Sequence, residues 1–312
     1  MDKHSLLETQ SRILPYVHNT PILTSHLLDD LAGAKLFFKC ENFQKMGAFK
    51  MRGAVNAIMQ LTKAQQERGV VTHSSGNFAQ ALSLAARNLG VTAYIVMPTN
   101  APKVKKEAVL GYGGIITDCE PNIQAREQAA TQIVEKKGAT FIHPSNDLNV
   151  ILGNATSAME LLEAQPDLDF VVSPVGGGGL IAGTALATHY FGQKCVVIGG
   201  EPLVADDAYR SLKTGKIESN DSAHTIADGL RTQLGDINFP IIQKYVDHII
   251  RVEEDEILRA MKLLWERLKI VVEPSSAVAF GAVLKDKSYF KDKSVGIILS
   301  GGNVDLDTIK FS

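Results

Sequence analysis

A run of four glycines stands where an apolar segment typical of a β-strand gives way to one typical of a helix. The run lies between DFVVSPV and LIAGTALA and comprises Gly176, Gly177, Gly178 and Gly179. Glycine lets the backbone approach an anion closely, and the unpaired N–H groups at a helix start favour negative charge. The run therefore predicts a phosphate-binding loop, which we favour over a merely flexible connection.

The glycine run alone does not identify the molecule that carries the phosphate. Read as G-x-G-x-x-A through Gly177, Gly179 and Ala182, it matches a dinucleotide fingerprint. Glu201 ends the next apolar run, where an acid that binds ribose is expected. No Lys-Ser or Lys-Thr pair follows the glycines, so a Walker-type loop is excluded. An NAD(P)-binding oxidoreductase is therefore one hypothesis.

A lysine in an apolar setting adds a second kind of chemistry. Lys50 lies between Phe49 and Met51, in a glycine-flanked turn before a helix that we expect from about Gly53. Desolvation lowers the pKa of a lysine and makes it a usable nucleophile or base. Taken alone, Lys50 could equally be a surface residue at a helix start.

Two polar turns also follow apolar runs. The first is the SSGN segment, Ser74, Ser75, Gly76 and Asn77. The second is SGGN, which begins at Ser300 and ends at Asn303. Such residues also cap helices for structural reasons. Because ligands of α/β proteins bind at the carboxyl ends of strands, the turns, the glycine run and Lys50 together predict one shared site.

Short apolar runs alternate with segments of helical period along the chain, a pattern typical of parallel sheets with helical crossovers. We expect an α/β fold in which the first strands and the later ones belong to two sheets, with a crossing near Pro144. Residues 211–234, rich in polar residues and glycine, are predicted to form a long loop.

Composition excludes several classes of protein. The chain has 312 residues and a formal net charge of -2, without the basic excess of a sequence-independent nucleic-acid binder. Its three cysteines are far apart and lack C-x-x-C spacing, so we expect neither disulfides nor a zinc site. No export signal or membrane-spanning segment is visible, and a cytoplasmic location is expected.

The ordered set of FKMRGA, SSGN, the tetraglycine and SGGN resembles the fold-type II pyridoxal-phosphate enzymes, in the branch of serine racemase and serine/threonine dehydratase. The resemblance runs nearly end to end and includes TIADGLR and VEPSSAV. It implies two doubly wound open sheets, with residues 1–52 and 147–312 in a large cofactor-binding domain and residues 53–146 in a small domain. It favours pyridoxal phosphate over a dinucleotide, because a dinucleotide enzyme has no reason to carry these motifs in this order. A relative that only binds the cofactor or an amino acid is disfavoured by Lys50.

The resemblance implies a role for each motif. Lys50 would bind the cofactor covalently beside Phe49 and later act as the base that takes the Cα proton. Asn77 would donate to the cofactor's 3′ oxygen, the glycine run would bind its phosphate, and Ser300 would face the pyridine nitrogen. A neutral hydroxyl at that place makes the ring a moderate electron sink. Ser74, Ser75, Gly76 and Asn77 would bind the substrate.

Ser75 decides between two activities within the branch. In the racemases a serine at this place lies on the face of the cofactor opposite the lysine, whereas typical threonine dehydratases carry alanine. We expect dehydration of L-serine and L-threonine to the 2-oxo acid and ammonia, with racemisation of serine as a companion or main activity. The alternative is that Ser75 only binds the substrate carboxylate.

Two departures leave substrate choice open. Phe78 replaces the family's histidine after SSGN, where we expect tolerated packing, and Ser145 replaces the asparagine that follows His-Pro in racemases of the human type. Threo-3-hydroxyaspartate is therefore an alternative substrate. The resemblance further implies a homodimer or homotetramer, and a Mg²⁺ or Ca²⁺ site formed by Glu201, Ala205 and Asp207.

Overall fold

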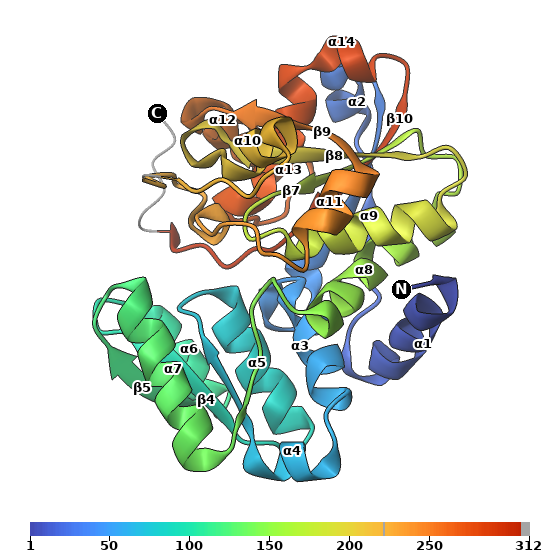
Figure 1. Cartoon of the computed structure of the whole chain (residues 1–312). Coiled ribbons are helices and arrows are strands. Elements are labelled where there is room, and N and C mark those ends of the chain that lie inside the picture. The colour runs from blue at the N-terminus through green and yellow to red at the C-terminus, as the bar shows by residue number, and fades with distance from the viewer. Residues whose placement is uncertain (221, 307–312) are drawn as a thin grey trace.

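The computed structural model describes residues 1–220 and 222–306, and the end of the predicted large domain, 307–312, lies outside them. The described residues form two sheets, each in its own half of the molecule (Figure 1). The larger sheet has six strands in the order β1 (Ile22–Leu23), β2 (Lys35–Cys40), β10 (Ser294–Leu299), β7 (Phe170–Pro174), β8 (Val196–Pro202) and β9 (Val246–Val252). The smaller has four, β5 (Ile115–Cys119), β4 (Ala93–Pro98), β3 (Val70–His73) and β6 (Thr140–Phe141).

The strand pairing confirms the predicted α/β class and refines it. All pairs of the smaller sheet are parallel. In the larger sheet only the edge strand β1 is antiparallel, to β2, so this sheet is mixed. The chain enters the smaller sheet after β2 and returns to the larger one at β7. The predicted domain boundaries stay a prediction.

Helices cover both faces of the larger sheet, as buried parallel strands require. Successive residues of β7 point to opposite faces, with Val171 in one apolar cluster and Phe170 and Val172 in the other. The helices of this half are α1 (Lys3–Ile13), α2 (His26–Ala32), α8 (Leu148–Ala164), α9 (Gly179–Phe191), α10 (Asp207–Thr214), α11 (Phe239–Tyr245), α12 (Glu254–Arg267), α13 (Pro274–Lys285) and α14 (Lys287–Phe290).

The smaller sheet packs against its own helices through two further apolar clusters, one on each face, and α7 contributes to the second of them. These helices are α3 (Lys50–Met59), α4 (Lys63–Arg68), α5 (Asn77–Asn88), α6 (Lys103–Gly111) and α7 (Ile123–Lys137). Helix α3 packs against α8 of the other half, and both approach closely at glycines. A Cβ at Gly53 would lie 2.6 Å from the Asn154 Oδ1 atom, and one at Gly153 would lie 2.5 Å from the Arg52 carbonyl oxygen.

Three local expectations differ from the structure. Helix α3 begins at Lys50 rather than at about Gly53. The predicted loop 211–234 is interrupted, because α10 continues to Thr214 and a 3-10 turn, η5, occupies Asp228–Leu230. The strand β9 was not predicted, since its buried residues do not alternate and its pairing with β8 carries a register shift. Among the described residues, no helix is long and apolar enough to cross a membrane.

Candidate active site

Lys50 lies at the boundary between the two halves, in an apolar and partly buried position. Its Nζ atom donates a hydrogen bond to the Pro144 carbonyl oxygen at 2.9 Å. The same atom lies 4.9 Å from the ring centroid of Phe49 and 5.7 Å from that of Phe78. Burial lowers the pKa of Lys50 to about 8, and the charge of Glu273 opposes this shift. A neutral amine is therefore accessible at mild pH.

The loop before Lys50 is hydrogen-bonded to the SGGN turn. The backbone N–H of Phe49 donates to the Ser300 carbonyl oxygen at 3.0 Å, and that of Gly302 donates to the Gly47 carbonyl oxygen at 2.9 Å. Ser300 directly follows the buried strand β10 and is 3% exposed. Residues about 250 positions apart in the chain thus share one backbone ladder, which fixes Ser300 relative to Lys50.

Asn77 connects the SSGN turn to the opposite half of the molecule. Its Nδ2 atom donates to both carboxylate oxygens of Glu273, at 2.9 and 3.1 Å. Its Oδ1 atom accepts from the Asn303 Nδ2 atom at 2.9 Å. Glu273 is 4% exposed, and burial raises its pKa to about 7 although the hydrogen bond from Asn77 lowers it. Sequence reasoning missed Glu273, which only its place in VEPSSAV before a helix could have suggested.

The other residues of the SSGN turn lie between β3 and α5. Ser74 and Ser75 are partly buried, and Gly76 caps α5. The Gly76 N–H donates to the Ser74 Oγ atom at 3.4 Å. The turn adjoins Lys50, because Phe78 in the first turn of α5 contacts the lysine. Phe78 is 2% exposed. The phenylalanine that stands here in place of the family's histidine therefore forms part of the buried wall of the site.

The glycine run is a buried loop at the carboxyl end of β7, and Gly179 begins α9. Among the described residues, none of its four backbone N–H groups donates a hydrogen bond to another part of the chain. Gly178 has φ +79°, a conformation that favours glycine. Buried N–H groups without an acceptor are costly, so four of them at a helix start favour an anionic ligand.

Ser145 joins the glycine run to Lys50. Its side chain is 5% exposed, and its Oγ atom would lie 2.5 Å from a Cβ placed on Gly177. The preceding residue, Pro144, accepts the hydrogen bond from Lys50. The structure therefore brings together the predicted lysine, both polar turns and the glycine run, as expected from the carboxyl ends of parallel strands.

His143 is a further polar residue beside Lys50 that sequence reasoning did not select. Its Nδ1 atom accepts from the backbone N–H groups of Ser145 at 3.2 Å and of Asn146 at 2.8 Å. Burial lowers the pKa of His143 to about 4, and His73 and Lys50 act in the same direction. The imidazole is neutral at physiological pH, and its proton is carried by Nε2 because Nδ1 is an acceptor.

A buried ionic network holds the first turn of the helix that begins at Lys50. Arg52 donates to Glu41 at 2.8 Å and to Glu160 at 2.7 Å, and Lys39 donates to Glu160 at 2.6 Å. Arg52 and Lys39 are fully buried. Although burial alone would raise the pKa of Glu41, Arg52 lowers it. These residues come from α3, β2, the turn at Glu41–Phe43 and α8, so the network fixes α3 against the larger sheet.

The three residues expected to bind a cation lie at the carboxyl end of β8. Glu201, Ala205 and Asp207 are fully buried. Burial, followed by the charge of Asp207, raises the pKa of Glu201 well above its ordinary value, and burial raises the pKa of Asp207 to about 6. Two adjacent buried acids repel each other when ionised, and a hard cation would relieve that repulsion.

The Glu201 carboxylate is also bound to protein groups. It accepts the backbone N–H groups of Ala208 at 3.0 Å and Tyr209 at 2.8 Å, at the start of α10. This position under α10 does not suit a ribose ligand. Among the described residues, no cluster of three or more His, Cys, Asp or Glu side chains could hold a metal ion. A cation here would be bound by two carboxylates, a carbonyl oxygen and water.

Residues 13–301 match the model of a family described as pyridoxal-phosphate dependent enzyme. The chain belongs to this family. It is 49% identical to a serine racemase of Dictyostelium discoideum over 97% of this chain and 94% of that protein. It is 48% identical to a beta-hydroxyaspartate dehydratase of Paracoccus denitrificans, covering 98% of each.

Solved structures of this enzyme family share the fold over nearly the whole chain. A threonine deaminase from T.th. superposes with a TM-score of 0.93 at 41% identity, over 98% of this chain and 99% of that one. The fold is therefore that of the fold-type II pyridoxal-phosphate enzymes. The comparisons support a racemase or ammonia-lyase dependent on pyridoxal phosphate.

The residues of the site fit this cofactor. The unpaired amides of Gly176 to Gly179 provide donors for its phosphate, and Lys50 provides an amine of lowered pKa for its aldehyde. Ser300 offers a neutral hydroxyl at the end of β10. No cationic side chain is needed at the phosphate, since helix-start amides alone bind anions.

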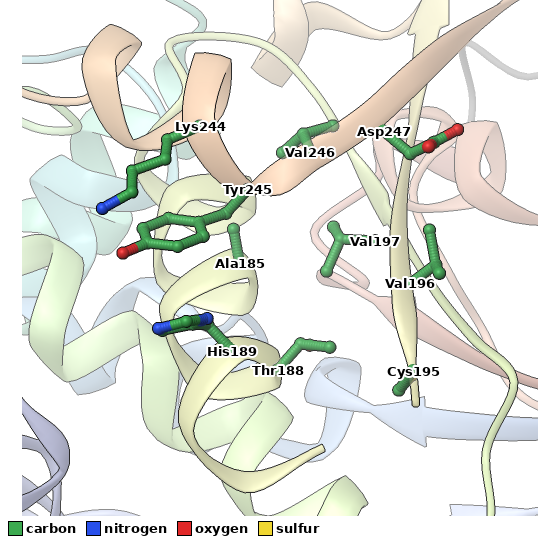
Figure 2. A pocket seen from close by; sticks show the side chains of 10 residues that line it. All are labelled: Ala185, Thr188, His189, Cys195, Val196, Val197, Lys244, Tyr245, Val246 and Asp247. Carbon is green, nitrogen blue, oxygen red and sulfur yellow. The ribbon is translucent and has the colours of Figure 1, made fainter. Parts of the chain in front are cut away.

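A surface cavity of about 420 Å³ lies elsewhere, at the amino ends of β8 and β9 (Figure 2). His189 of α9 and Tyr245 of α11 form one wall, with ring centroids 4.4 Å apart, and Cys195 lies at its other side. None of the predicted site residues lines this cavity. Ligands of parallel sheets bind at the carboxyl ends of strands, so the cavity is separate from the candidate active site.

Proposed function

We propose that the protein removes water from the β-hydroxy amino acids L-serine and L-threonine, giving the 2-oxo acid and ammonia, and that it also racemises serine. Loss of the β-hydroxyl as water leaves an enamine, which tautomerises and is hydrolysed, so water lost in one step is regained in the next. The observation that carries the proposal is the convergence of Lys50, the SSGN turn and Ser300 on one site.

Lys50 is proposed to accept the Cα proton of the substrate. Its lowered pKa, about 8, leaves a substantial fraction of the amine neutral near physiological pH. Pyridoxal phosphate, when bound, supplies the electron sink that acidifies this proton. The hydrogen bond to Pro144 and the rings of Phe49 and Phe78 hold the amine in place.

Ser75 is proposed to hold or return a proton on the face opposite Lys50. Inversion at Cα needs one proton carrier on each face, whereas elimination needs only the base that takes the proton. The sequence places a serine here, as in the racemases, and the turn that carries it adjoins Lys50. We therefore propose that both activities share Lys50 and that racemisation alone depends on Ser75.

A Mg²⁺ or Ca²⁺ ion bound by Glu201, Ala205 and Asp207 is part of the proposal. The Asp207 carboxylate accepts the backbone N–H of Leu234 at 3.3 Å, and Leu234 in turn packs against Gly178 of the phosphate loop. A cation that neutralises the two buried acids would therefore stabilise the segment behind the loop. The expected contribution is structural rather than chemical.

A second candidate substrate is threo-3-hydroxyaspartate. Two relatives carry names of this activity, the Paracoccus denitrificans enzyme and an L-threo-3-hydroxyaspartate ammonia-lyase of Saccharomyces cerevisiae that is 44% identical over 96% of this chain and 93% of that protein. They are about as similar to this chain as the serine racemase is. The β-carboxylate of this substrate needs a cationic partner that serine does not.

The deciding experiment incubates the holoenzyme with L-serine, L-threonine and threo-3-hydroxyaspartate and measures the 2-oxo acid and the D-enantiomer separately. We expect 2-oxo acid from L-serine and L-threonine, and D-serine from L-serine. Ser75→Ala should lose racemisation far more than elimination from the L-substrate. Equal loss of both would show that Ser75 binds substrate instead, and turnover of 3-hydroxyaspartate alone would replace the proposed substrates with the second candidate.

We further propose that the protein acts on small amino acids in the cytoplasm as a homodimer or homotetramer, without a nucleic-acid or membrane partner. The low net charge of -2 agrees with the absence of a nucleic-acid partner. Sedimentation analysis of the purified holoenzyme would test the oligomeric state, and a monomer at micromolar concentration would contradict it.

A further inference from the structure

One ion pair joins the two halves of the molecule beside the active site. Lys105 on α6 donates to the carboxylate of Asp228 in the η5 turn. Helix α6 lies in the half with the smaller sheet, at the lower left of Figure 1. Of the ion pairs among residues 1–220 and 222–306, this is the only one between residues 53–146 and the rest of the chain. Both side chains are partly exposed, at 26% and 43%.

The segment that carries Asp228 packs directly on the phosphate loop. A Cβ at Gly176 would lie 2.7 Å from the Leu230 Cα atom, and one at Gly177 would lie 2.9 Å from the Thr232 Oγ1 atom. The Asn238 Nδ2 atom donates to the Gly177 carbonyl oxygen at 2.9 Å. Residues 228–238, called here the covering segment, therefore pack against the phosphate loop at its Cα atoms and at the Gly177 carbonyl group.

The covering segment also contacts the cofactor side of the site. The Gly229 N–H donates to the Ser275 Oγ atom at 3.0 Å, two residues after Glu273. Glu273 in turn binds Asn77, so the ion pair and the Asn77–Glu273 contact cross the same boundary. The charge of Asp228 raises the pKa of Glu273, and the charge of Lys105 lowers it. Movement of α6 away from Asp228 would thus free the η5 end of the covering segment from the half with the smaller sheet.

We propose that the Lys105–Asp228 pair is a latch between the two halves that slows exchange of the cofactor at the phosphate loop. The inference rests on the cofactor of the family and not on which amino acid is the substrate. Exposed pairs contribute modestly, so loss of the latch is expected to speed cofactor release by about two- to five-fold. High salt screens such ion pairs, so the difference in release rate between the wild-type protein and the variants should be smaller at high salt.

A neighbouring ion pair provides a matched control. Lys106 follows Lys105 on α6 and pairs with Asp118 at 2.6 Å. The Lys106 side chain is 22% exposed, close to the 26% of Lys105. Unlike the first pair, Lys106 and Asp118 both belong to the half with the smaller sheet. Lys106→Ala removes a pair of the same kind from the same helix without touching the boundary. It should leave the rate of cofactor release unchanged.

The test measures the release of pyridoxal phosphate from the holoenzyme, followed by its visible absorbance after mixing with an excess of a trap for the free aldehyde. Lys105→Ala and Asp228→Ala should each speed release, the double variant should be no faster than either single one, and the charge exchange Lys105→Asp with Asp228→Lys should restore slow release. Circular dichroism of each variant checks that it is folded.

Unchanged release in both single variants, additive effects in the double variant, or an equal effect of Lys106→Ala would overturn the latch. Because no substrate is present, this result is independent of the substrate assay. A protein that turns over none of the three amino acids but releases pyridoxal phosphate as predicted would reject the proposed function and keep the latch.

Discussion

The lowered pKa of Lys50 predicts a pH-dependent cost to the stability of the cofactor-free protein. In the unfolded chain the ammonium keeps its ordinary pKa of 10.5, whereas burial lowers it to about 8 in the fold. Below pH 8 both states are protonated and the cost is constant. Between these two pKa values the unfolded state binds the proton and the folded state does not, so the free energy of unfolding rises with pH. Lys50→Met removes this dependence.

The magnitude follows from the two pKa values. Lowering the pKa from 10.5 to about 8 corresponds to ~3.4 kcal/mol, at ~1.36 kcal/mol for each pKa unit. Between pH 7.5 and pH 9.5, the linkage relation gives a rise of about 2 kcal/mol in the wild-type protein relative to Lys50→Met. This figure is an upper value, because the side chain is partly exposed and solvent screens part of the effect.

The assay is urea denaturation of both cofactor-free proteins at pH 7.5 and pH 9.5, with fluorescence and circular dichroism as coincident probes. Lys50→Met is expected to be the more stable protein at pH 7.5, with its advantage reduced at pH 9.5. Groups that do not interact with Lys50 titrate alike in both proteins and cancel in the difference. Replacing Lys50→Met by Lys50→Gln must leave the pH dependence of the stability difference from wild type unchanged, because that dependence comes from the titration of the wild-type lysine. A difference that is the same at both pH values would refute the lowered pKa.

Three further predictions concern the phosphate loop, the proposed cation site and the buried ionic network. Gly177→Ala places a Cβ 2.5 Å from the Ser145 Oγ atom, so affinity for pyridoxal phosphate, measured by absorbance titration, should fall by about ten-fold or more; unchanged affinity would contradict the close packing. The proposed cation is expected to raise the Tm of the wild-type protein when Ca²⁺ or Mg²⁺ is added, and Asp207→Asn should abolish this rise; a rise that persists in the variant would place the cation elsewhere. Arg52→Met leaves the buried carboxylate of Glu41 unpaired and should lower the free energy of unfolding by about 3–5 kcal/mol in urea denaturation, whereas a neutral effect would show that the network is dispensable.

Much of the site was predictable because its residues carry local signals. The glycine run, the SSGN turn and Ser300 each follow an apolar run that becomes a strand, and the carboxyl ends of parallel strands meet at one edge. Glu273 and His143 have no such signal. Each is a single polar residue before a proline, and only folding brings Glu273 to Asn77 and His143 to Lys50.

The sequence thus determined which chemical groups the site contains, and the tertiary structure determined the environment of each group. The order of the motifs was sufficient to predict the family and the α/β class, because residue types and their spacing decide which groups exist at the strand ends. The lowered pKa of Lys50, the ionic network around Arg52 and the Lys105–Asp228 pair depend on burial and on contacts between distant segments. Desolvation and Coulomb interactions act through space, so the sequence suggested a lowered pKa for Lys50 from its apolar neighbours but could not give its size or the two ionic contacts.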